Sequence, residues 1–398
     1  MATVPALTDR TAAQRWSEVR DEEGVWGDLR PELLEAVRTI LETTMEDEMA
    51  AELVASRYER SPWRTDLRNG AYHRTLVTEL GAITDLRIPR RRLVPYRPSF
   101  LERAARRTTR VDGVLRQAFL RGLSTRETAA LAETLTGVPL SAASISRLTR
   151  QLDEQVAAFH RRPIAFRACY LLVDGLWVSV RTSTRATRRV VLACYAIDVD
   201  GRRELLDYRQ AASESSAEWS RFLRSLVERG LDPDAVRLVA ADGAGGIAAA
   251  VAEAFPAAHL QRCWTHRIRN ILGAIPLGER RDCLRGLRAI YRARTRRAAV
   301  AAYWRWAQVW RVRHPGLVRH LERDLDDLLA VFALPESIRL HLRTTNLIER
   351  AFRELRRRIR PMGALADRRS ADRILYGQVL RLNELLSRRP LATFTQET

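Results

Sequence analysis

The 398-residue sequence contains no lysine, so all 68 of its basic residues are arginine. GC-rich coding DNA, which favours arginine codons, is the simplest explanation for that choice of residue. It does not explain why positive charge exceeds negative charge, with a formal net charge of +20. Because basic side chains that neutralise phosphates release counterions, this excess favours a polyanionic partner such as nucleic acid.

The sequence also lacks the patterns of secreted and membrane proteins. Its cysteines form no Cys-x2-Cys pair, which argues against a disulfide framework and a structural zinc cluster; they are Cys169, Cys194, Cys263 and Cys283. No apolar run approaches the roughly 18–20 residues of a membrane span, and the first residues lack the layout of a secretory signal. We expect a soluble intracellular protein of two or three domains with no membrane partner.

Charge is unevenly distributed near the N-terminus. Residues 17–50 hold eleven acids and three arginines, and their pattern is typical of a helix with one apolar face, formed by Leu33, Val37, Ile40 and Leu41. Such an acidic segment repels DNA. We expect it to pack on another subunit or on the body of its own chain.

The charge balance reverses between residues 87 and 110, where nine arginines face one acid, Glu102. The prolines of this stretch predict an extended basic arm that does not form a packed element. Its arginines either contact the DNA backbone or are solvated in a linker; the candidates for DNA contact are Arg90, Arg91 and Arg92.

Two helices that follow are typical of a helix-turn-helix. Ser124 and Glu127 predict a capping box for a helix to about Leu135, and Gly137 marks the turn. Ser141 is expected to cap a second helix with an apolar stripe of Ile145, Leu148 and Leu152. Its other face offers side chains for phosphates or base edges, although such helix pairs also serve structural roles; the candidates are Ser144, Arg147 and Arg150.

Strands are predicted from Cys169 onward. The expected order is three strands (169–180, 190–199, 204–209), a helix (216–229), a strand (236–240), a short helix to 254, a strand (259–263) and another helix. Three antiparallel strands followed by a strand-helix alternation indicate an α/β catalytic core with ribonuclease H-like topology and a mixed five-stranded sheet.

The remaining chain is predicted to be helical. Residues 267–340 form an all-helical insertion, whose tryptophans Trp304, Trp306 and Trp310 either pack in its core or stack on a displaced base. The predicted domains are a helical acidic segment (1–60), a basic arm and helix-turn-helix (61–160), the first part of the core (161–266), the insertion (267–340), and a final catalytic helix with a C-terminal helix (341–398). The first two make a helical N-terminal DNA-binding region.

Two aspartates lie where the predicted strands would present them to a metal ion. Asp174 lies within an apolar strand, where an unpaired carboxylate is costly; the alternative is an aspartate paired with an arginine. Asp242 ends a buried strand, where ligand-binding loops gather; the alternative is an N-cap of the next helix. Two divalent ions held by such carboxylates can activate the attacking group and stabilise the leaving group in phosphodiester chemistry.

Glu349 is the third candidate, from the helix predicted at 345–360. By itself, Asn346 with Glu349 predicts a helix-capping box equally well. In a ribonuclease H-like topology, however, a carboxylate on the helix after the fifth strand is needed to complete the metal site.

Several short motifs together resemble the Mutator family of transposases from bacterial insertion sequences, and the resemblance runs from about residue 48 to 386. The matching stretches are Arg68-Asn69-Gly70, Gly122-Leu123-Ser124-Thr125-Arg126, Val173-Asp174-Gly175, Ala241-Asp242-Gly243, Gln261-Arg262-Cys263-Trp264-Thr265-His266 and Thr345-Asn346-Leu347-Ile348-Glu349-Arg350. The Asp-Asp-Glu trio of the family falls on Asp174, Asp242 and Glu349. The resemblance therefore implies that these three are the catalytic and metal-binding residues.

The resemblance implies a DNA transposase that binds terminal inverted repeats, cleaves DNA with two Mg²⁺ ions (Mn²⁺ substituting) and transfers the 3′-hydroxyl to target DNA. It implies a homodimer or larger assembly in the bacterial cytoplasm, associated with the nucleoid. Its Cys-x2-His signature suggests supporting roles for Cys263 and His266, and Asn346 joins them beside the trio. Arginines after Glu349 either grip phosphate or form a solvated face; the candidates are Arg350, Arg353, Arg357 and Arg360. The rivals are a related nuclease or resolvase and an inactive DNA-binding relic.

Overall fold

The computed structural model describes residues 29–101, 105–181, 185–243, 246–360 and 365–391. Residues 17–28 of the acidic segment, Glu102 of the expected basic arm and the polar end of the chain lie outside them. The chain forms two compact units. Unit 1 comprises the chain up to Phe119 together with Leu123–Leu148, and unit 2 comprises Leu120–Gly122 and the chain from Thr149 onward.

Unit 1 contains a helix packed on a β-hairpin. The acidic segment forms α2 (Arg30–Leu53), and it is followed by the antiparallel strands β1 (Arg68–Thr78) and β2 (Gly81–Arg91). Helix and hairpin share one apolar core, whose members are Met45, Met49, Leu53, Leu76, Ile83, Leu86, Ile88 and Tyr96. The acidic helix therefore packs on its own chain, one of the two expected possibilities, although Leu33 and Ile40 of its predicted apolar face are exposed.

The prediction of an unpacked basic arm is wrong for residues 87–91, and the N-terminal region is not wholly helical. These residues belong to β2, because the alternation of Leu86 and Ile88 with polar residues places one face of the strand in the core. The arginines of the hairpin pair with the acids of the helix: Arg68 and Arg87 contact Glu46. The opposite charges of the two segments thus compensate each other within unit 1.

The predicted helix pair is present as α4 (Thr125–Thr136) and α5 (Ala142–Arg150), which pack with α3 (Thr109–Leu120). The capping box of Ser124 and Glu127 is confirmed, and Gly137 ends α4 in the left-handed conformation. Ser141 Oγ accepts a hydrogen bond from the Ser144 N–H, as expected of a cap. α5 ends before Leu152, which instead begins α6 (Leu152–Arg161).

Unit 2 is built on a mixed five-stranded sheet, as the sequence predicted. Its strands are β3 (Tyr170–Arg181), β4 (Ala186–Ile197), β5 (Arg203–Ala211), β6 (Leu238–Ala241) and β7 (His259–Arg262). The spatial order is β5-β4-β3-β6-β7, in which β3, β4 and β5 are antiparallel and β6 and β7 run parallel to β3. The predicted order of strands and helices is confirmed.

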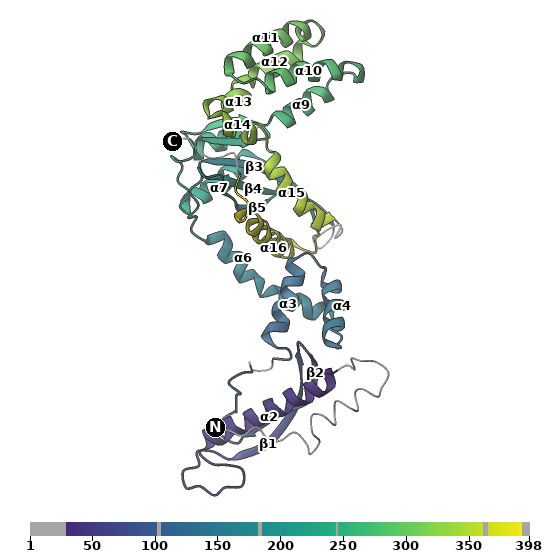
Figure 1. Ribbon diagram of the computed structural model, residues 1–398, viewed down its shortest axis with the longest axis vertical. Coiled ribbons are helices and arrows are strands. Elements are labelled where there is room, and N and C mark those ends of the chain that lie inside the picture. Colours follow the sequence, from purple (N-terminus) through teal and green to yellow (C-terminus); the bar gives the residue numbers. More distant parts are fainter. Residues whose placement is uncertain (1–28, 102–104, 182–184, 244–245, 361–364, 392–398) are drawn as a thin grey trace. The chain divides into compact units, whose positions relative to one another are not determined.

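Helices cover both faces of this sheet, with α7 (Ser216–Glu228) on one side and α15 (Asn346–Ile359) and α16 (Arg368–Ser387) on the other (Figure 1). α7 and α8 (Ile247–Ala254) bury their apolar faces on the strands through Trp219, Phe222, Leu223 and Val251. Asn383 of α16 covers the edge strand β5, since its side-chain amide exchanges two hydrogen bonds with the Leu205 backbone.

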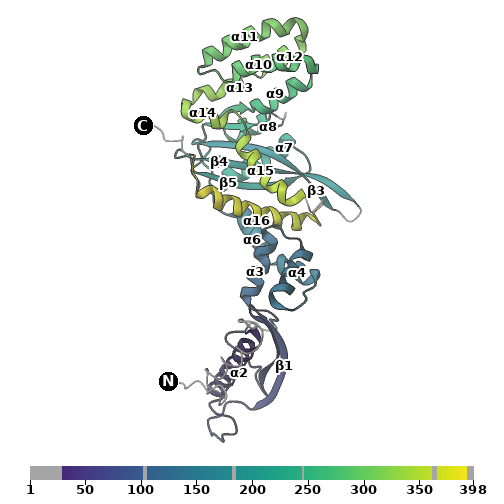
Figure 2. The same cartoon turned by 45° about the vertical axis from the view of Figure 1, so that its right-hand side comes forward.

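The predicted insertion is helical, and its helices are α9 (Trp264–Gly273), α10 (Arg280–Tyr291), α11 (Arg296–Arg313), α12 (Pro315–Arg323), α13 (Leu325–Leu329) and α14 (Glu336–Leu342), seen together in Figure 2. Trp306 and Trp310 stack in its core with their rings 6.2 Å apart, so core packing accounts for them, whereas Trp304 is exposed. Among the described residues, no helix has the length and apolarity needed to cross a bilayer.

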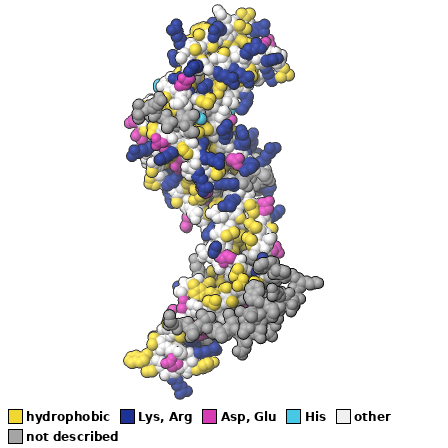
Figure 3. All heavy atoms as spheres, in the orientation of Figure 1, with side chains coloured by type: hydrophobic (Ala, Val, Ile, Leu, Met, Phe, Trp, Pro, Cys, Tyr) yellow, Lys and Arg dark blue, Asp and Glu magenta, His cyan; other side chains and the backbone are white. Residues whose placement is uncertain are grey.

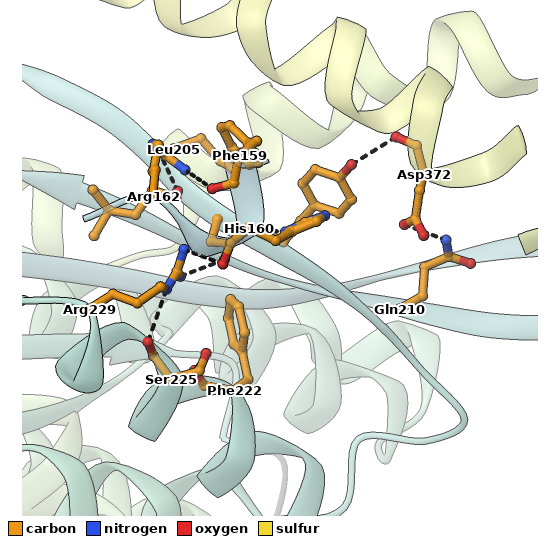
Figure 4. A network of polar contacts seen from close by, with 12 residues as sticks. Phe159, His160, Arg162, Leu205, Gln210, Phe222, Ser225, Arg229 and Asp372 are labelled. Atoms are coloured by element: carbon orange, nitrogen blue, oxygen red, sulfur yellow. Dashed lines mark hydrogen bonds and ion pairs between the residues drawn. The ribbon is translucent and has the colours of Figure 1, made fainter. Parts of the chain in front are cut away.

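A buried polar network ties α6, β5, α7 and α16 together (Figure 4). Asp207 is its centre: its carboxylate contacts His160 Nδ1 at 2.7 Å and Arg229 Nη2 at 2.5 Å. Arg229 also donates to the carbonyl oxygens of His160 and Ser225. Because these charges are paired within the fold, the network has a structural role rather than a catalytic one.

We expect Asp207→Ala to lower the free energy of unfolding by about 3–5 kcal/mol, because it leaves the nearly buried Arg229 charge unpaired. Urea unfolding followed by circular dichroism measures this. Glu384→Ala is the control: it removes an exposed pair with Arg388 and is expected to cost less than about 1 kcal/mol. Equal losses in the two variants would contradict the structural role of the network.

Candidate active site

The register of the sheet brings Asp174 and Asp242 to the same edge. β6 ends at Ala241, which is paired with Val173 of β3 and with Arg262 of β7. Asp174 is the next residue along β3, and Asp242 is the first residue after β6. Both aspartates therefore lie where the parallel pairing of β3 with β6 ends, at the carboxyl ends of β6 and β7, which is where open α/β sheets gather their ligands.

Asp174 is a buried carboxylate among other carboxylates. Only 9% of the residue is exposed, and its Oδ1 accepts a hydrogen bond of 2.8 Å from the Gly175 N–H. Burial raises the pKa of Asp174 to about 7, and the neighbouring charges of Asp242 and Glu349 add to the rise. Because no arginine is among the groups that shift this pKa, the alternative of an Asp174–Arg pair is not supported.

Glu349 reaches this edge through contacts between the starts of α9 and α15. The Trp264 N–H donates to the carbonyl oxygen of Arg343, and the buried Thr345 donates from both its N–H and its Oγ1 to Cys263 Sγ. Thr345 Oγ1 also lies 3.0 Å from Glu349 Oε1. Thr345 thus connects the end of β7 to Glu349, a role that the sequence analysis missed.

His266 lies between the carboxylates and Cys263. Its Nδ1 is 3.8 Å from Glu349 Oε1, too far for a hydrogen bond, and within the described residues this buried nitrogen has no hydrogen-bond partner. Interaction with the Cys263 sulfur raises the pKa of His266 to about 9 against the effect of burial, and the charges of Asp174 and Glu349 add to the rise. A cationic imidazole is therefore held beside the acidic trio.

Of the three supporting residues predicted from the sequence, Cys263 and His266 lie close to Glu349, whereas Asn346 is exposed. Cys263, His266 and Glu349 offer ligand atoms that all lie within 4.8 Å of one another. The charge of Asp174 raises the pKa of His266, and the charge of Asp242 raises the pKa of Asp174. Asn346 is exposed at the first position of α15. The N-cap is Thr345, which makes no side-chain capping bond, so the alternative of an Asn346–Glu349 capping box is wrong.

The predicted DNA-contacting arginines are mostly on the surface. α15 buries Ile348, Phe352 and Leu355 and exposes an arginine face, made up of Arg350, Arg353, Arg356, Arg357 and Arg360. On α5, Arg147 and Arg150 are exposed and Ser144 is half-buried. Arg90 and Arg92 are exposed, whereas Arg91 forms an ion pair of 2.9 Å with Glu52 and is engaged within its own unit.

A basic pocket of unit 2 continues from the Asp242 loop. It extends from Gly243 along α9 to the start of α12, and its arginines pair with acids of the fold: Arg262 with Asp324 and Asp327, Arg267 with Asp324, and Arg313 with Glu279. Figure 3 shows that arginine side chains also outnumber acidic ones on the visible face of unit 2. The exposed arginines of α15 therefore supply positive charge on the helix that carries Glu349.

Comparisons with known proteins show the family of the chain. The family model described as "Transposase, Mutator family" matches residues 8–385. The chain is 37% identical over 326 residues to the transposase for insertion sequence element ISRM5 of Rhizobium meliloti (strain 1021), covering 82% of this chain and 81% of that relative. It is 35% identical over 353 residues to the transposase for IS1081 of Mycobacterium tuberculosis (strain ATCC 25618 / H37Rv), covering 88% and 84%.

A third relative, the transposase for IS406 of Burkholderia multivorans (strain ATCC 17616 / 249), is 33% identical over 354 residues, which cover 88% of this chain and 90% of that relative. The chain belongs to the Mutator family of transposases. The family resemblance drawn from the short motifs is thereby confirmed.

Proposed function

We propose that this transposase is a metal-dependent polynucleotidyl transferase with a ribonuclease H-like core, in which Asp174, Asp242 and Glu349 form the catalytic site. It would cleave DNA at the terminal inverted repeats of an insertion sequence and join the released 3′-hydroxyl to target DNA. The observation that carries this proposal is the meeting of Asp174, Asp242 and Glu349 at one sheet edge, although they come from three separate elements. The strand order β5-β4-β3-β6-β7 supports the ribonuclease H-like assignment.

The donor set fits two divalent ions of the Mg²⁺ type, with Mn²⁺ as a substitute. Carboxylate oxygens are the ligands that Mg²⁺ prefers, and three carboxylates leave room for the waters that it retains. Burial and the charges of Asp242 and Glu349 raise the pKa of Asp174 although His266 lowers it, so a bound cation would relieve the repulsion among the acids. When bound, such ions would lower the pKa of the attacking hydroxyl and stabilise the departing oxygen.

The chain's own residues position this chemistry. Asp174 is fixed by its strand and by the Gly175 N–H, and Glu349 is oriented by Thr345. The cationic His266, whose buried Nδ1 faces Glu349 without a hydrogen bond, is suited to a phosphate oxygen of the bound strand. The arginine face of α15 and the basic pocket beyond Gly243 would bind the backbone on either side of the scissile phosphate.

The β1–β2 hairpin and α5 would recognise the ends of the element. The exposed face of α5, with Ser144, Arg147 and Arg150, is suited to base edges or phosphates, and Arg90 and Arg92 are suited to the backbone. Bridging two ends would require at least two copies of the chain, and a homodimer or larger assembly remains part of this proposal. The same reaction would require the protein to act at the nucleoid.

The direct test is to incubate the protein with Mg²⁺, a DNA duplex carrying the element's terminal repeats and a target plasmid, and to sequence the products. We expect repeat ends joined to the plasmid through their 3′-hydroxyls. Cut ends without joined products would favour a hydrolytic nuclease or resolvase. Repeat binding without cutting would indicate an inactive DNA-binding protein.

A further inference from the structure

Helix α10 of the insertion (Figure 2) carries a row of arginines on its outer face. Its buried residues, Cys283, Leu287 and Ile290, pack in the core of the insertion. Since successive residues of a helix are turned by about 100°, the face opposite that core holds residues spaced by four, three and four positions. All of them are exposed arginines, here called the α10 stripe: Arg281, Arg285, Arg288 and Arg292, the last being the C-cap.

The α10 stripe has almost no acidic partners. Within the described residues, Arg281, Arg288 and Arg292 form no ion pair, and Arg285 pairs with the exposed Asp282 of its own helix at 3.1 Å. Other exposed arginines of the insertion do pair with acids on other elements: Arg294 with Glu336, Arg296 with Asp326 and Arg311 with Glu322. The insertion therefore compensates these arginines and leaves the positive charge of the stripe largely uncompensated.

Such a row of like charges is unfavourable for the helix itself. Arginines three and four positions apart repel one another, and Arg281 is also repelled by the partial positive charge of the helix N-terminus, because it lies in the first turn. A bound polyanion would replace both repulsions by attraction. A preference for arginine codons explains why the stripe contains no lysine, but it does not explain why its residues share one face.

The C-terminal end of α10 is joined to the segment that precedes α15. Arg343 Nη1 donates a hydrogen bond of 2.7 Å to the carbonyl oxygen of Tyr291, and the guanidinium of Arg343 lies over the Tyr291 ring. The carbonyl oxygen of Arg343 accepts the Trp264 N–H at the start of α9. Because Arg292 directly follows Tyr291, the α10 stripe ends beside the segment that leads to the candidate active site.

We infer that the α10 stripe binds the phosphate backbone of duplex DNA irrespective of its sequence. The inference rests on the proposed function, since this DNA would be the substrate of the same active site. From Arg281 to Arg292 the stripe extends over about 16 Å of helix axis. One strand of a duplex presents about five phosphates over that length, so each arginine can contact a separate phosphate. Contacts of this kind position DNA without reading its bases.

The test measures how the full-length protein binds two labelled duplexes, one with the element's terminal repeats and one without them. Fluorescence anisotropy is recorded from about 50 to 200 mM NaCl, because the salt dependence reports the number of phosphates that the protein neutralises. In the stripe variant, glutamine replaces three arginines of the α10 stripe: Arg281→Gln, Arg288→Gln and Arg292→Gln. These changes remove repulsion between like charges, so the variant is expected to fold as wild type does, and circular dichroism checks this.

The matched control removes the same charge from the insertion at arginines that pair with acids: Arg294→Gln, Arg296→Gln and Arg311→Gln. We expect the stripe variant to bind both duplexes about 100-fold more weakly than wild type at about 100 mM NaCl. Its plot of log affinity against log salt concentration should be less steep by about three. The control should stay within about fivefold of wild type, because salt screens charges that do not contact the DNA.

Equal binding by the stripe variant and the control would overturn the inference, and so would a loss confined to the duplex with repeats. Either result would leave the proposed function intact if Asp174→Asn still loses cleavage and joining. Conversely, cleavage retained by Asp174→Asn would overturn the proposed catalytic site. A loss of binding to both duplexes by the stripe variant alone would still support the α10 stripe as a DNA-binding surface.

Discussion

The Asp174→Asn variant is expected to lose DNA cleavage and joining by at least about 1,000-fold, while it binds terminal-repeat DNA as wild type does. The amide keeps the size of the side chain and its ability to accept the Gly175 N–H, so the strand is preserved. It removes the negative charge on which the metal site depends. Product yield on labelled repeat DNA and a gel-shift titration measure the two properties.

The same variant is expected to be more stable than wild type when metal is removed. The pKa of Asp174 is raised to about 7 in the folded chain, above the roughly 3.9 of an unfolded aspartate. A carboxyl group whose pKa is higher in the folded chain than in the unfolded chain stabilises the fold at pH values below its unfolded pKa. This stabilisation is lost as the pH rises through the folded pKa. At pH 8 with EDTA, Asp174→Asn should therefore unfold with a free energy higher by about 2–4 kcal/mol.

The advantage of Asp174→Asn should shrink towards pH 4, because the wild-type carboxyl is then protonated in the folded chain and about half protonated in the unfolded chain. Mg²⁺ at pH 8 should stabilise wild type but not the variant, because only wild type binds it. Urea unfolding at the two pH values measures both effects. Undiminished cleavage by Asp174→Asn would remove this residue from the catalytic site, whatever its stability.

Glu349→Gln is expected to lower cleavage and joining by about 100- to 1,000-fold. The residue is held beside His266 and Thr345, and a neutral amide there would weaken metal binding without disturbing α15. Asn346→Ala is the matched control on the same helix turn. Because Asn346 is exposed and does not cap α15, that variant should keep activity within about threefold of wild type and stability within about 0.5 kcal/mol.

A different result would show that Glu349 serves the helix terminus. Equal loss of stability in Glu349→Gln and Asn346→Ala, with activity falling only in proportion, would indicate that the motif serves the helix terminus and not the metal. Parallel measurements of product yield and urea unfolding on both variants separate these outcomes.

The core of unit 2 was predictable from the sequence because its signals are local. The apolar runs of β3 and β4, the amphipathic pattern of α7 and the strand before Asp242 each fix an element by themselves. Their order then restricts the topology to few arrangements. Asp174 and Asp242 follow directly, because their positions in the sheet depend only on where two strands run and end.

The elements that were missed depend on contacts distant in sequence. The hairpin of β1 and β2 was interpreted as an arm because of its prolines and its many arginines. Acids of α2 such as Glu46 neutralise these arginines, and no local pattern reveals this pairing. Thr345 contacts Cys263 across 82 positions. The sequence of a short segment does not reveal such long-range contacts.

The most direct measurement of the central claim is the anomalous scattering of Mn²⁺ in crystals of the full-length protein. The account predicts two peaks about 3.5–4 Å apart, in contact with the carboxylates of Asp174, Asp242 and Glu349. A single peak on Cys263, His266 and Glu349 that leaves both aspartates without metal would contradict it.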